Sequence, residues 1–599
     1  MTLLPNLQSR FRQALATLTD QPEPWLEMIR RAQDTRFGDY QANFAMALGR
    51  QLNKKPRELA AEVVARLDMA DLCQPPEVAG PGFINLRLKD EWLVERLTAA
   101  VNDPRLGVEP TARPRTYVID YSAPNVAKPM HVGHIRSTVI GDALCRTLRF
   151  LGHQVISDNH IGDWGTQFGM IIYGYKHFLE PDAYRNRPVE ELARLYRLVR
   201  QLVDYVENEK VATVDADPLL AQLAAEHPQI RRNTQAETAK LHAGDAENHQ
   251  LWQEFMPYCL EDIQRIYRRL DVHFDHALGE SYYHDMLPGV VEELRRRGIA
   301  RESQGAVCVF LEGQSVPMIV QKQDGAYLYA TTDLATIRYR MEQWRPDAIL
   351  YVVDHRQSLH FQQLFGTARL LGYDQVELQH VSFGTVLGKD GRPFKTRAGD
   401  TVGLESLLDE AVFRAARIVA ESDDSKPNGA ELPPDQRACV AETVGMGALK
   451  YADLSQNRTS DYEFDYEKML AMNGNTATYM QYAYARVRNI FAKGNIDVEQ
   501  LRASGAAITL GTPAERALAI ELLHFGDALS LAMTDYRPNQ LTAYLFDLAN
   551  SFSTFYEKCS VLKAETPELR NSRLLLSDLT ARIIRKGLEL LGIGVEEKM

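Results

Sequence analysis

Strands and helices alternate along the middle of this 599-residue chain, and this alternation restricts its fold more than any other feature. Five runs rich in β-branched and aromatic residues read as strands: YVIDYS (117–122), HQVISDNHI (153–161), AVCVFL (306–311), AILYVVD (348–354) and VELQHVSFG (376–384). Stretches with helical periodicity separate them. This order is typical of a parallel, doubly wound sheet. We therefore expect an α/β, Rossmann-like domain in which all five strands belong to one sheet.

Changes in composition predict two further domains. Residues 1–110 combine helical periodicity with the strand-like GPGFINLRL, and they end within a Pro- and Arg-rich linker at 101–117. The α/β domain then covers residues 111–437 and carries a charged helical insertion at about 178–267. After the Pro- and acid-rich stretch at 422–437, strand signals nearly vanish, so residues 438–599 are expected to form an all-α bundle.

Charge and cysteine usage exclude some classes of protein. The net charge of −12 argues against binding nucleic acid without regard to its sequence, but leaves recognition of a folded RNA open. The six cysteines form no C-x-x-C pair, which disfavours zinc fingers and thioredoxin-like chemistry. No apolar run has the roughly 20 residues that span a bilayer, and the first residues lack the pattern of a secretory signal. A cytoplasmic protein is expected.

Two histidines lie three residues apart in SAPNVAKPMHVGHIRSTVIG (122–141). Prolines keep the early part extended, and apolar residues recur at helical spacing from about Gly133. His131 and His134 therefore lie at a helix N-terminus directly after a strand, where N–H groups attract anions. Both imidazoles could donate hydrogen bonds to phosphates, and Gly133 lets a nucleotide approach the backbone. Two ordinary loop histidines are the alternative interpretation.

A glycine-rich basic loop lies far downstream in VLGKDGRPFKTRAGDTVGLESLLDEA (386–411), and a helix is expected from about Leu404. Transfer of an adenylyl group passes through a pentavalent phosphorus and is catalysed mainly by positioning and electrostatic stabilisation. A mobile loop that brings Lys395 and Arg397 to the leaving pyrophosphate would suit this reaction. The alternative is a solvated surface turn.

These motifs resemble the HIGH and KMSKS signatures of class I aminoacyl-tRNA synthetases. Five blocks in the same order are similar to arginyl-tRNA synthetases: SAPNVAKPMHVGHIRST, GDWGTQFGM, YLYATTDLA, DHRQSLHFQQLF and GRPFKTRAG. The resemblance covers essentially the whole chain. It implies an arginine–tRNA ligase that uses ATP and Mg²⁺, needs tRNA(Arg) for activation, and binds ATP through His131, Gly133, His134, Lys395 and Arg397.

One departure from the family pattern concerns the basic loop. FKTRAG supplies a single lysine, Lys395, where the broader class has two. Lys128 lies three residues before His131, on the other wall of the same expected site. We hypothesise that Lys128 supplies the missing positive charge, which would make it catalytic together with His131, His134 and Lys395.

The arginine side chain requires carboxylates that meet its planar guanidinium. Tyr329 and Asp333 are four residues apart and would face one cleft if a helix begins near Thr331 or Thr332. A core aromatic and a helix N-cap are the alternatives for these two residues. The resemblance implies an arginine site formed by Ala123, which replaces the serine of many family members, and by Asn125, His134, Glu280, Tyr329, Asp333 and Gln357.

The same resemblance assigns the two outer domains to tRNA. In YMQYAYARVRNIFAK, tyrosines that can stack on bases alternate with cations that can neutralise phosphates. A buried aromatic stripe is the alternative. The expected contacts are Phe83 and Asn85 in the first domain and Tyr479, Tyr482, Arg486 and Met599 in the last. Gly80 stands where some relatives carry asparagine, so the first set matches only in part.

Two other functions would account for some of these features. A small-molecule adenylyltransferase would share the H-x-G-H motif but needs neither outer domain. A non-catalytic paralogue that only holds tRNA should have lost His131, His134 or Lys395, and all three are present. We expect a monomer that binds L-arginine, ATP and tRNA(Arg), holds no metal on protein ligands, and binds neither membrane nor DNA.

Overall fold

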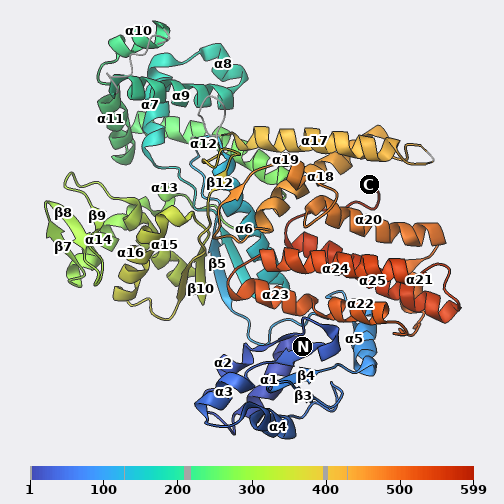
Figure 1. Ribbon diagram of the computed structural model, residues 1–599. Coiled ribbons are helices and arrows are strands. Elements are labelled where there is room, and N and C mark those ends of the chain that lie inside the picture. Colours follow the sequence, from blue (N-terminus) through green and yellow to red (C-terminus); the bar gives the residue numbers. More distant parts are fainter. Residues whose placement is uncertain (1–2, 127, 208–217, 395–401, 428) are drawn as a thin grey trace. The chain divides into compact units, whose positions relative to one another are not determined.

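The structure is a computed structural model that describes residues 3–126, 128–207, 218–394, 402–427 and 429–599 (Figure 1). The chain divides into two compact units. Unit 1 comprises residues 1–112, 418–451 and 469–599, and unit 2 comprises residues 113–417 and 452–468. Basic-loop residues 395–401, among them Lys395 and Arg397, lie outside the described residues.

A four-stranded parallel sheet forms the centre of unit 2, which confirms the doubly wound fold. Its order is β11 (Glu377–His380), β10 (Ala348–Tyr351), β5 (Thr116–Asp120) and β6 (Gln154–Asp158). The chain leaves β5 towards β6 on one side, and it leaves β10 towards β11 on the other. The crevice between the carboxyl ends of β5 and β10 is therefore the topological switch point, where such sheets bind ligands.

One strand prediction is wrong in its placement. AVCVFL contains β8 (Ala306–Val309), which pairs antiparallel with β7 (Ala300–Ser303) and β9 (Met318–Gln321) in a separate sheet. Gln304 and Gly305 have φ values of 51° and 80°. Two successive residues of positive φ make a tight hairpin turn, so the chain reverses here instead of crossing over through a helix.

Helices surround the parallel sheet and form the insertion. α7, α9 and α11 pack side by side (Figure 1) around buried Tyr173, Val199 and Leu202. The helices from residue 132 to 370 are α6 (Val132–Phe150), α7 (Thr166–Phe178), α8 (Pro181–Asn186), α9 (Pro188–Glu207), α10 (Pro218–Glu226), α11 (Ile230–His242), α12 (Ala246–Arg269), α13 (Glu280–Tyr283), α14 (Leu287–Arg296), α15 (Tyr329–Gln343) and α16 (Ser358–Leu370).

Shorter elements complete the region after β11. β12 (Val386–Leu387), where the basic loop begins, pairs in parallel with β13 (Tyr462–Glu463). The long α17 (Leu404–Asp424) begins at the predicted residue. The other helices of this region are α18 (Pro434–Leu454) and α19 (Tyr466–Met469).

Unit 1 joins the first and last parts of the chain. An antiparallel sheet of β1 (Ile29–Arg31), β2 (Tyr40–Ala42), β4 (Phe83–Leu86) and β3 (Glu77–Ala79) packs with α1 (Leu3–Leu15), α2 (Glu23–Leu26), α3 (Ala45–Gln51) and α4 (Pro56–Arg66), and α5 (Asp90–Asn102) follows. Arg516 forms ion pairs with Asp39 and Asp90, which ties this part to the later helices.

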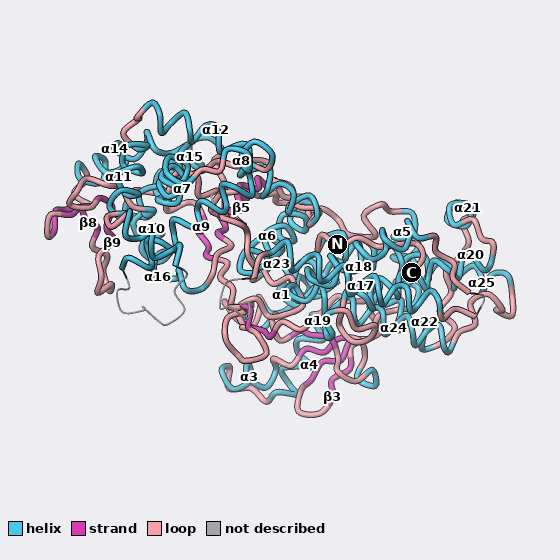
Figure 2. The backbone as a smooth tube through the Cα atoms, turned by 90° about the horizontal axis from the view of Figure 1, so that it is seen from above, coloured by secondary structure: helices cyan, strands magenta, loops and turns pink. Residues whose placement is uncertain are grey.

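The last part of the chain is helical, and its helices appear in cyan in Figure 2. They are α20 (Ala477–Gly494), α21 (Val498–Ala503), α22 (Pro513–Leu523), α23 (Phe525–Thr534), α24 (Asn539–Lys558) and α25 (Pro567–Leu590). Within the described ranges, no single helix has the length and apolar composition to cross a membrane. The bent pair α22–α23 meets both criteria only when its two helices are taken together.

Candidate active site

The two histidines cap the helix that follows the central strand. α6 begins at Val132, and His131 is its N-cap residue. The Nδ1 atom of His131 accepts a hydrogen bond from the Gly133 N–H at 3.1 Å. The His131 N–H in turn donates to Nδ1 of His134 at 3.0 Å. Because backbone N–H groups only donate, both Nδ1 atoms are acceptors, so each neutral ring carries its proton on Nε2.

Both imidazoles are neutral at physiological pH. The pKa of His134 is lowered to about 3, mainly by burial and in part by the neighbouring His131 ring, whose centroid lies 4.0 Å away. Burial also lowers the pKa of His131, to which the positive charges of Lys128 and Arg356 contribute. The site therefore presents two neutral Nε2–H donors beside positive side chains, an arrangement suited to polyphosphate.

The loop between β5 and α6 holds two successive non-glycine residues in the left-handed region of backbone conformation. Ser122 and Ala123 have φ values of 72° and 45°. The Ala123 N–H donates to Oδ1 of Asn159 at 3.0 Å, which holds the loop against the end of β6. Asn125 pairs with Gly162, where a Cβ atom would lie 2.5 Å from the Asn125 Oδ1. Only glycine at 162 leaves room for this carboxamide.

Tyr329 and Asp333 share one face of α15. This helix begins at Tyr329, two residues before the expected start, so Asp333 lies one full turn inside it. Tyr329 is 62% exposed, and its ring meets His360 edge-to-face at 4.7 Å. The His360 Nε2–H donates to Asp333 Oδ2 at 2.6 Å. The alternatives, a core aromatic and an N-cap aspartate, are therefore wrong.

Glu280 provides a second carboxylate, which interacts electrostatically with that of Asp333. Burial raises the pKa of Glu280; His160 opposes this effect, and the negative charges of Asp163 and Asp333 add to it. Asp163 fixes the neighbouring turn, because its carboxylate accepts hydrogen bonds from the Ser281 N–H at 2.9 Å and the Ser281 hydroxyl at 2.6 Å. Grouped carboxylates of this kind favour a bound cation such as guanidinium, which would return the pKa of Glu280 towards its ordinary range.

Gln357 is the last residue of the short 3₁₀ helix His355–Gln357 that follows β10. It is the N-cap residue of α16, its side chain is exposed, and it precedes His360 by one turn. Sequence reasoning missed Asn159, His160, Asp163 and His360. The first three follow β6 directly, and polar residues at the carboxyl end of a parallel strand are a signal that would have found them.

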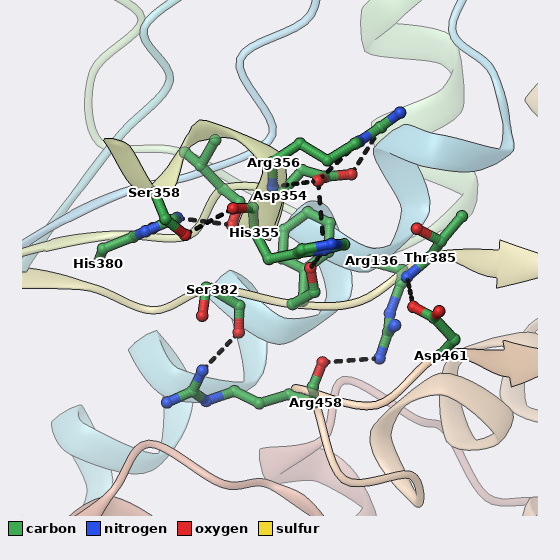
Figure 3. A network of polar contacts seen from close by, with 12 residues as sticks. Arg136, Asp354, His355, Arg356, Ser358, His380, Ser382, Thr385, Arg458 and Asp461 are labelled. Atoms are coloured by element: carbon green, nitrogen blue, oxygen red, sulfur yellow. Dashed lines mark hydrogen bonds and ion pairs between the residues drawn. The ribbon is translucent and has the colours of Figure 1, made fainter. Parts of the chain in front are cut away.

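A network of polar contacts links α6 with the segments around Ser382 and Arg458 (Figure 3). Arg136 of α6 is buried in an ion pair with Asp453 at 3.0 Å and donates to the carbonyl oxygens of Ser460 and Arg458. Arg458 and Asp461 bind the backbone of Ser382 and Thr385, which lead into β12. These contacts connect the histidine helix to the start of the basic loop.

Only part of the expected phosphate-binding set falls on described residues. Lys128 is half-buried, and its Nζ atom lies 5.7 Å from the centroid of the Tyr196 ring. Its effect on the pKa of His131 places its charge near that histidine. The loop positions Lys395 and Arg397 lie outside the described residues. Among those that are described, no group of three or more His, Cys, Asp or Glu side chains could hold a metal ion.

Three of the expected RNA-binding residues line one cavity of about 960 Å³ in unit 1, namely Tyr482, Arg486 and Met599. Glu597 fixes the C-terminal segment here by accepting hydrogen bonds from Tyr484 at 2.6 Å and Arg488 at 2.7 Å. Tyr479 instead packs against Phe546 and donates to Asn550. Because Tyr484 is buried and Tyr482 lines the cavity, the aromatic stripe is divided between the core and the cavity.

The other expected RNA contacts lie on β4. Phe83 is half-buried beside Gly80, whose φ is 51°. Asn85 is buried, and its Oδ1 accepts a hydrogen bond from Gln41 Nε2 at 2.8 Å. Gln41 is the more exposed of these two amides.

Family models match three segments of the chain. Residues 96–466 match the catalytic domain of class I (R) tRNA synthetases, residues 480–599 match the DALR anticodon-binding domain, and residues 5–88 match the arginyl-tRNA synthetase N-terminal domain. Together with the parallel sheet and the H-x-G-H helix start, these matches define a class I aminoacyl-tRNA synthetase.

Full-length relatives identify the family within this class. The chain is 48% identical to an arginine–tRNA ligase of Rhodopirellula baltica and 44% identical to that of Escherichia coli strain K12, with both chains covered completely. It matches the solved arginyl-tRNA synthetase of Plasmodium falciparum with a TM-score of 0.80 at 27% identity, covering 100% of this chain and 99% of the other. That of Thermus thermophilus gives 0.80 at 25% identity, with full coverage of both. The chain belongs to the arginyl-tRNA synthetase family.

Proposed function

We propose that this chain joins L-arginine to the 3′-terminal ribose of tRNA(Arg), with ATP as the energy source. The observation that carries this proposal is the presence, in one unit, of neutral histidine donors suited to phosphate and grouped carboxylates suited to guanidinium. The family membership agrees with it. Exchange of labelled pyrophosphate into ATP tests the first step, and it should require both arginine and tRNA.

Activation forms one bond and breaks one. An oxygen of the arginine carboxylate bonds to the α-phosphorus of ATP, and pyrophosphate leaves with the electron pair of the broken P–O bond. His131 and His134 donate through Nε2–H to phosphate oxygens whose negative charge grows in the transition state. Gly133 lets those oxygens approach the start of α6. The terminal ribose hydroxyl then displaces AMP from the arginyl-adenylate.

The carboxylates of Asp333 and Glu280 determine that arginine is the amino acid bound. Asp333 and Glu280 bind the guanidinium, and Tyr329 covers it. Asn125 and the backbone around Ala123 hold the α-amino and carboxylate end, near His134. Gln357 completes this site from the short 3₁₀ helix after β10. Mg²⁺ arrives with the phosphates of ATP, and Lys395 and Arg397 approach from the basic loop.

Lys128 replaces the second lysine of the basic loop in this proposal. Pyrophosphate gains charge only as its bond to the α-phosphorus breaks, so a cation there acts mainly on rate. Lys128→Ala should lower the turnover number for adenylate formation roughly fivefold to tenfold, and raise the Michaelis constant for ATP less. Lys128→Arg should recover only part of the loss, because a planar fork replaces a compact ammonium. Pyrophosphate exchange measures both constants.

A second lysine in the basic loop provides the control for this prediction. If Lys128 and the basic loop contact the same phosphate, Thr396→Lys should restore part of the turnover number that Lys128→Ala loses. A double-mutant cycle should then show that the two positions are coupled. Unchanged turnover in Lys128→Ala, or strictly additive effects, would show that Lys128 is only a solvated loop residue.

The cavity beside the C-terminus binds the anticodon region in this proposal. Tyr482 and Met599 contact bases, Arg486 contacts phosphate, and Phe83 and Asn85 contact the D-loop corner of the tRNA. Arg486→Ala should raise the Michaelis constant for tRNA roughly threefold and reduce its salt dependence, because one phosphate contact is lost. Replacement of the exposed Arg417 in α17 by alanine is the control. Equal Michaelis constants for tRNA in the two variants would contradict the assignment.

We also propose that the protein is cytoplasmic and that it is a monomer.

A further inference from the structure

A turn that directly follows β10 carries an arginine that the proposed reaction does not yet use. Asp354 accepts three hydrogen bonds from Arg356: from its N–H at 2.8 Å, from Nε at 2.9 Å and from Nη2 at 2.7 Å. These bonds fix the direction of the guanidinium. The side chain is nevertheless 71% exposed. Asp354 takes two of the five guanidinium N–H donors, so three point away from it.

The position of this turn is fixed on the β10 wall of the switch-point crevice. The Ser137 hydroxyl of α6 donates to the Val352 carbonyl at 2.6 Å and accepts from the Ser122 N–H at 2.8 Å. It thereby ties the exit of β10 to the histidine helix. On the other side, the His355 N–H donates to the Phe383 carbonyl at 3.0 Å. Figure 3 shows Arg356 extending away from His355 and His380.

The charge of Arg356 acts on the histidine at the start of α6. After burial and Lys128, it is the third cause that lowers the pKa of His131. Lys128 belongs to the β5 wall of the crevice, and Arg356 belongs to the β10 wall. Two cations from opposite walls therefore act on the same histidine, which places both near the group that this histidine binds.

We propose that Arg356 binds the phosphate groups of ATP from the β10 wall, opposite His131 and Lys128. A guanidinium with free N–H donors matches phosphate oxygens in a bidentate manner. This inference rests on the proposed function, because it names a further contact to the same nucleotide. Phosphates carry charge before the reaction begins, so an exposed guanidinium contributes to ATP binding more than to rate.

Michaelis constants for ATP and arginine test this assignment in the full-length protein with tRNA present. Arg356→Ala should raise the Michaelis constant for ATP about fivefold and leave the Michaelis constant for arginine within about twofold of wild type. The effect is modest because Asp354 and solvent screen the charge. Arg356→Lys should restore part of the affinity, since it keeps the charge but loses the fork.

A matched control lies in the first part of the chain. Arg36 makes the same contacts with Asp34, two residues before it, and its side chain is 81% exposed. Arg36→Ala removes an identical local pair, so it should leave the constant for ATP unchanged. The proposal would be overturned if the Michaelis constant for ATP of Arg356→Ala stayed within twofold of wild type. It would also be overturned if the Michaelis constants for ATP and arginine rose equally. Absence of exchange in the wild-type protein would instead reject the proposed function.

Discussion

Replacing His134 with asparagine should lower the turnover number for adenylate formation about 100-fold, the size seen when one donor to a developing anion is lost. The Oδ1 atom of asparagine can take the place of Nδ1 and keep the hydrogen bond from the His131 N–H. The helix cap therefore survives, and only the outward Nε2–H donor disappears. Pyrophosphate exchange measures the rate, and tRNA affinity should change little.

Glutamine at the same position provides the opposite control. Its amide nitrogen reaches the place of Nε2 but leaves the His131 N–H without its acceptor. His134→Gln should therefore keep much of the rate while losing some stability, seen as a lower melting temperature. If asparagine is the better substitute, His134 acts through the cap alone. Equal activity in wild type and in both variants would remove His134 from the mechanism.

Replacing Asp333 with asparagine should reduce kcat/KM for arginine by at least tenfold, because a charge-assisted hydrogen bond contributes about 1.5–3 kcal/mol. The change keeps the shape of the side chain but removes the charge that faces guanidinium. The Michaelis constant for ATP should stay nearly unchanged, because the nucleotide binds at the start of α6.

Glu342→Gln is the matched control for this variant. Glu342 is an exposed carboxylate in the last turn of the same helix, α15, so its neutralisation changes net charge equally. It should leave arginine kinetics unaltered. If Asp333→Asn and Glu342→Gln behave alike, the arginine pocket is placed on the wrong residues.

The start of α6 could be predicted because its signals are local. Two prolines, a glycine and an apolar period specify the helix N-terminus within a few residues. The start of α15 was missed by two residues because its N-cap, Leu328, provides no side-chain cap. The expected start near Thr331 or Thr332 lies inside the helix, where the Thr331 hydroxyl donates to the Val320 carbonyl. This tertiary contact could not be predicted from neighbouring residues.

Contacts between distant residues explain the rest of the site that sequence reasoning missed. Asp163 and Ser281 are 118 positions apart, and Asp333 and His360 are 27 apart. Periodicity and propensity describe neighbours along the chain and carry no information about such pairs. AVCVFL belongs to an antiparallel hairpin whose turn is formed by the neighbouring residues Gln304 and Gly305. A short apolar run such as AVCVFL fits a parallel and an antiparallel sheet equally well, so the run alone could not predict this.

Charging of total tRNA with each of the twenty amino acids tests the central claim most directly. The purified chain is incubated with ATP, Mg²⁺, total tRNA and one labelled amino acid at a time, and the label that becomes acid-precipitable is counted. Arginine alone should be esterified, and Asp333→Asn should reduce that signal without creating another. Esterification of a different amino acid, or none with arginine, would contradict the account.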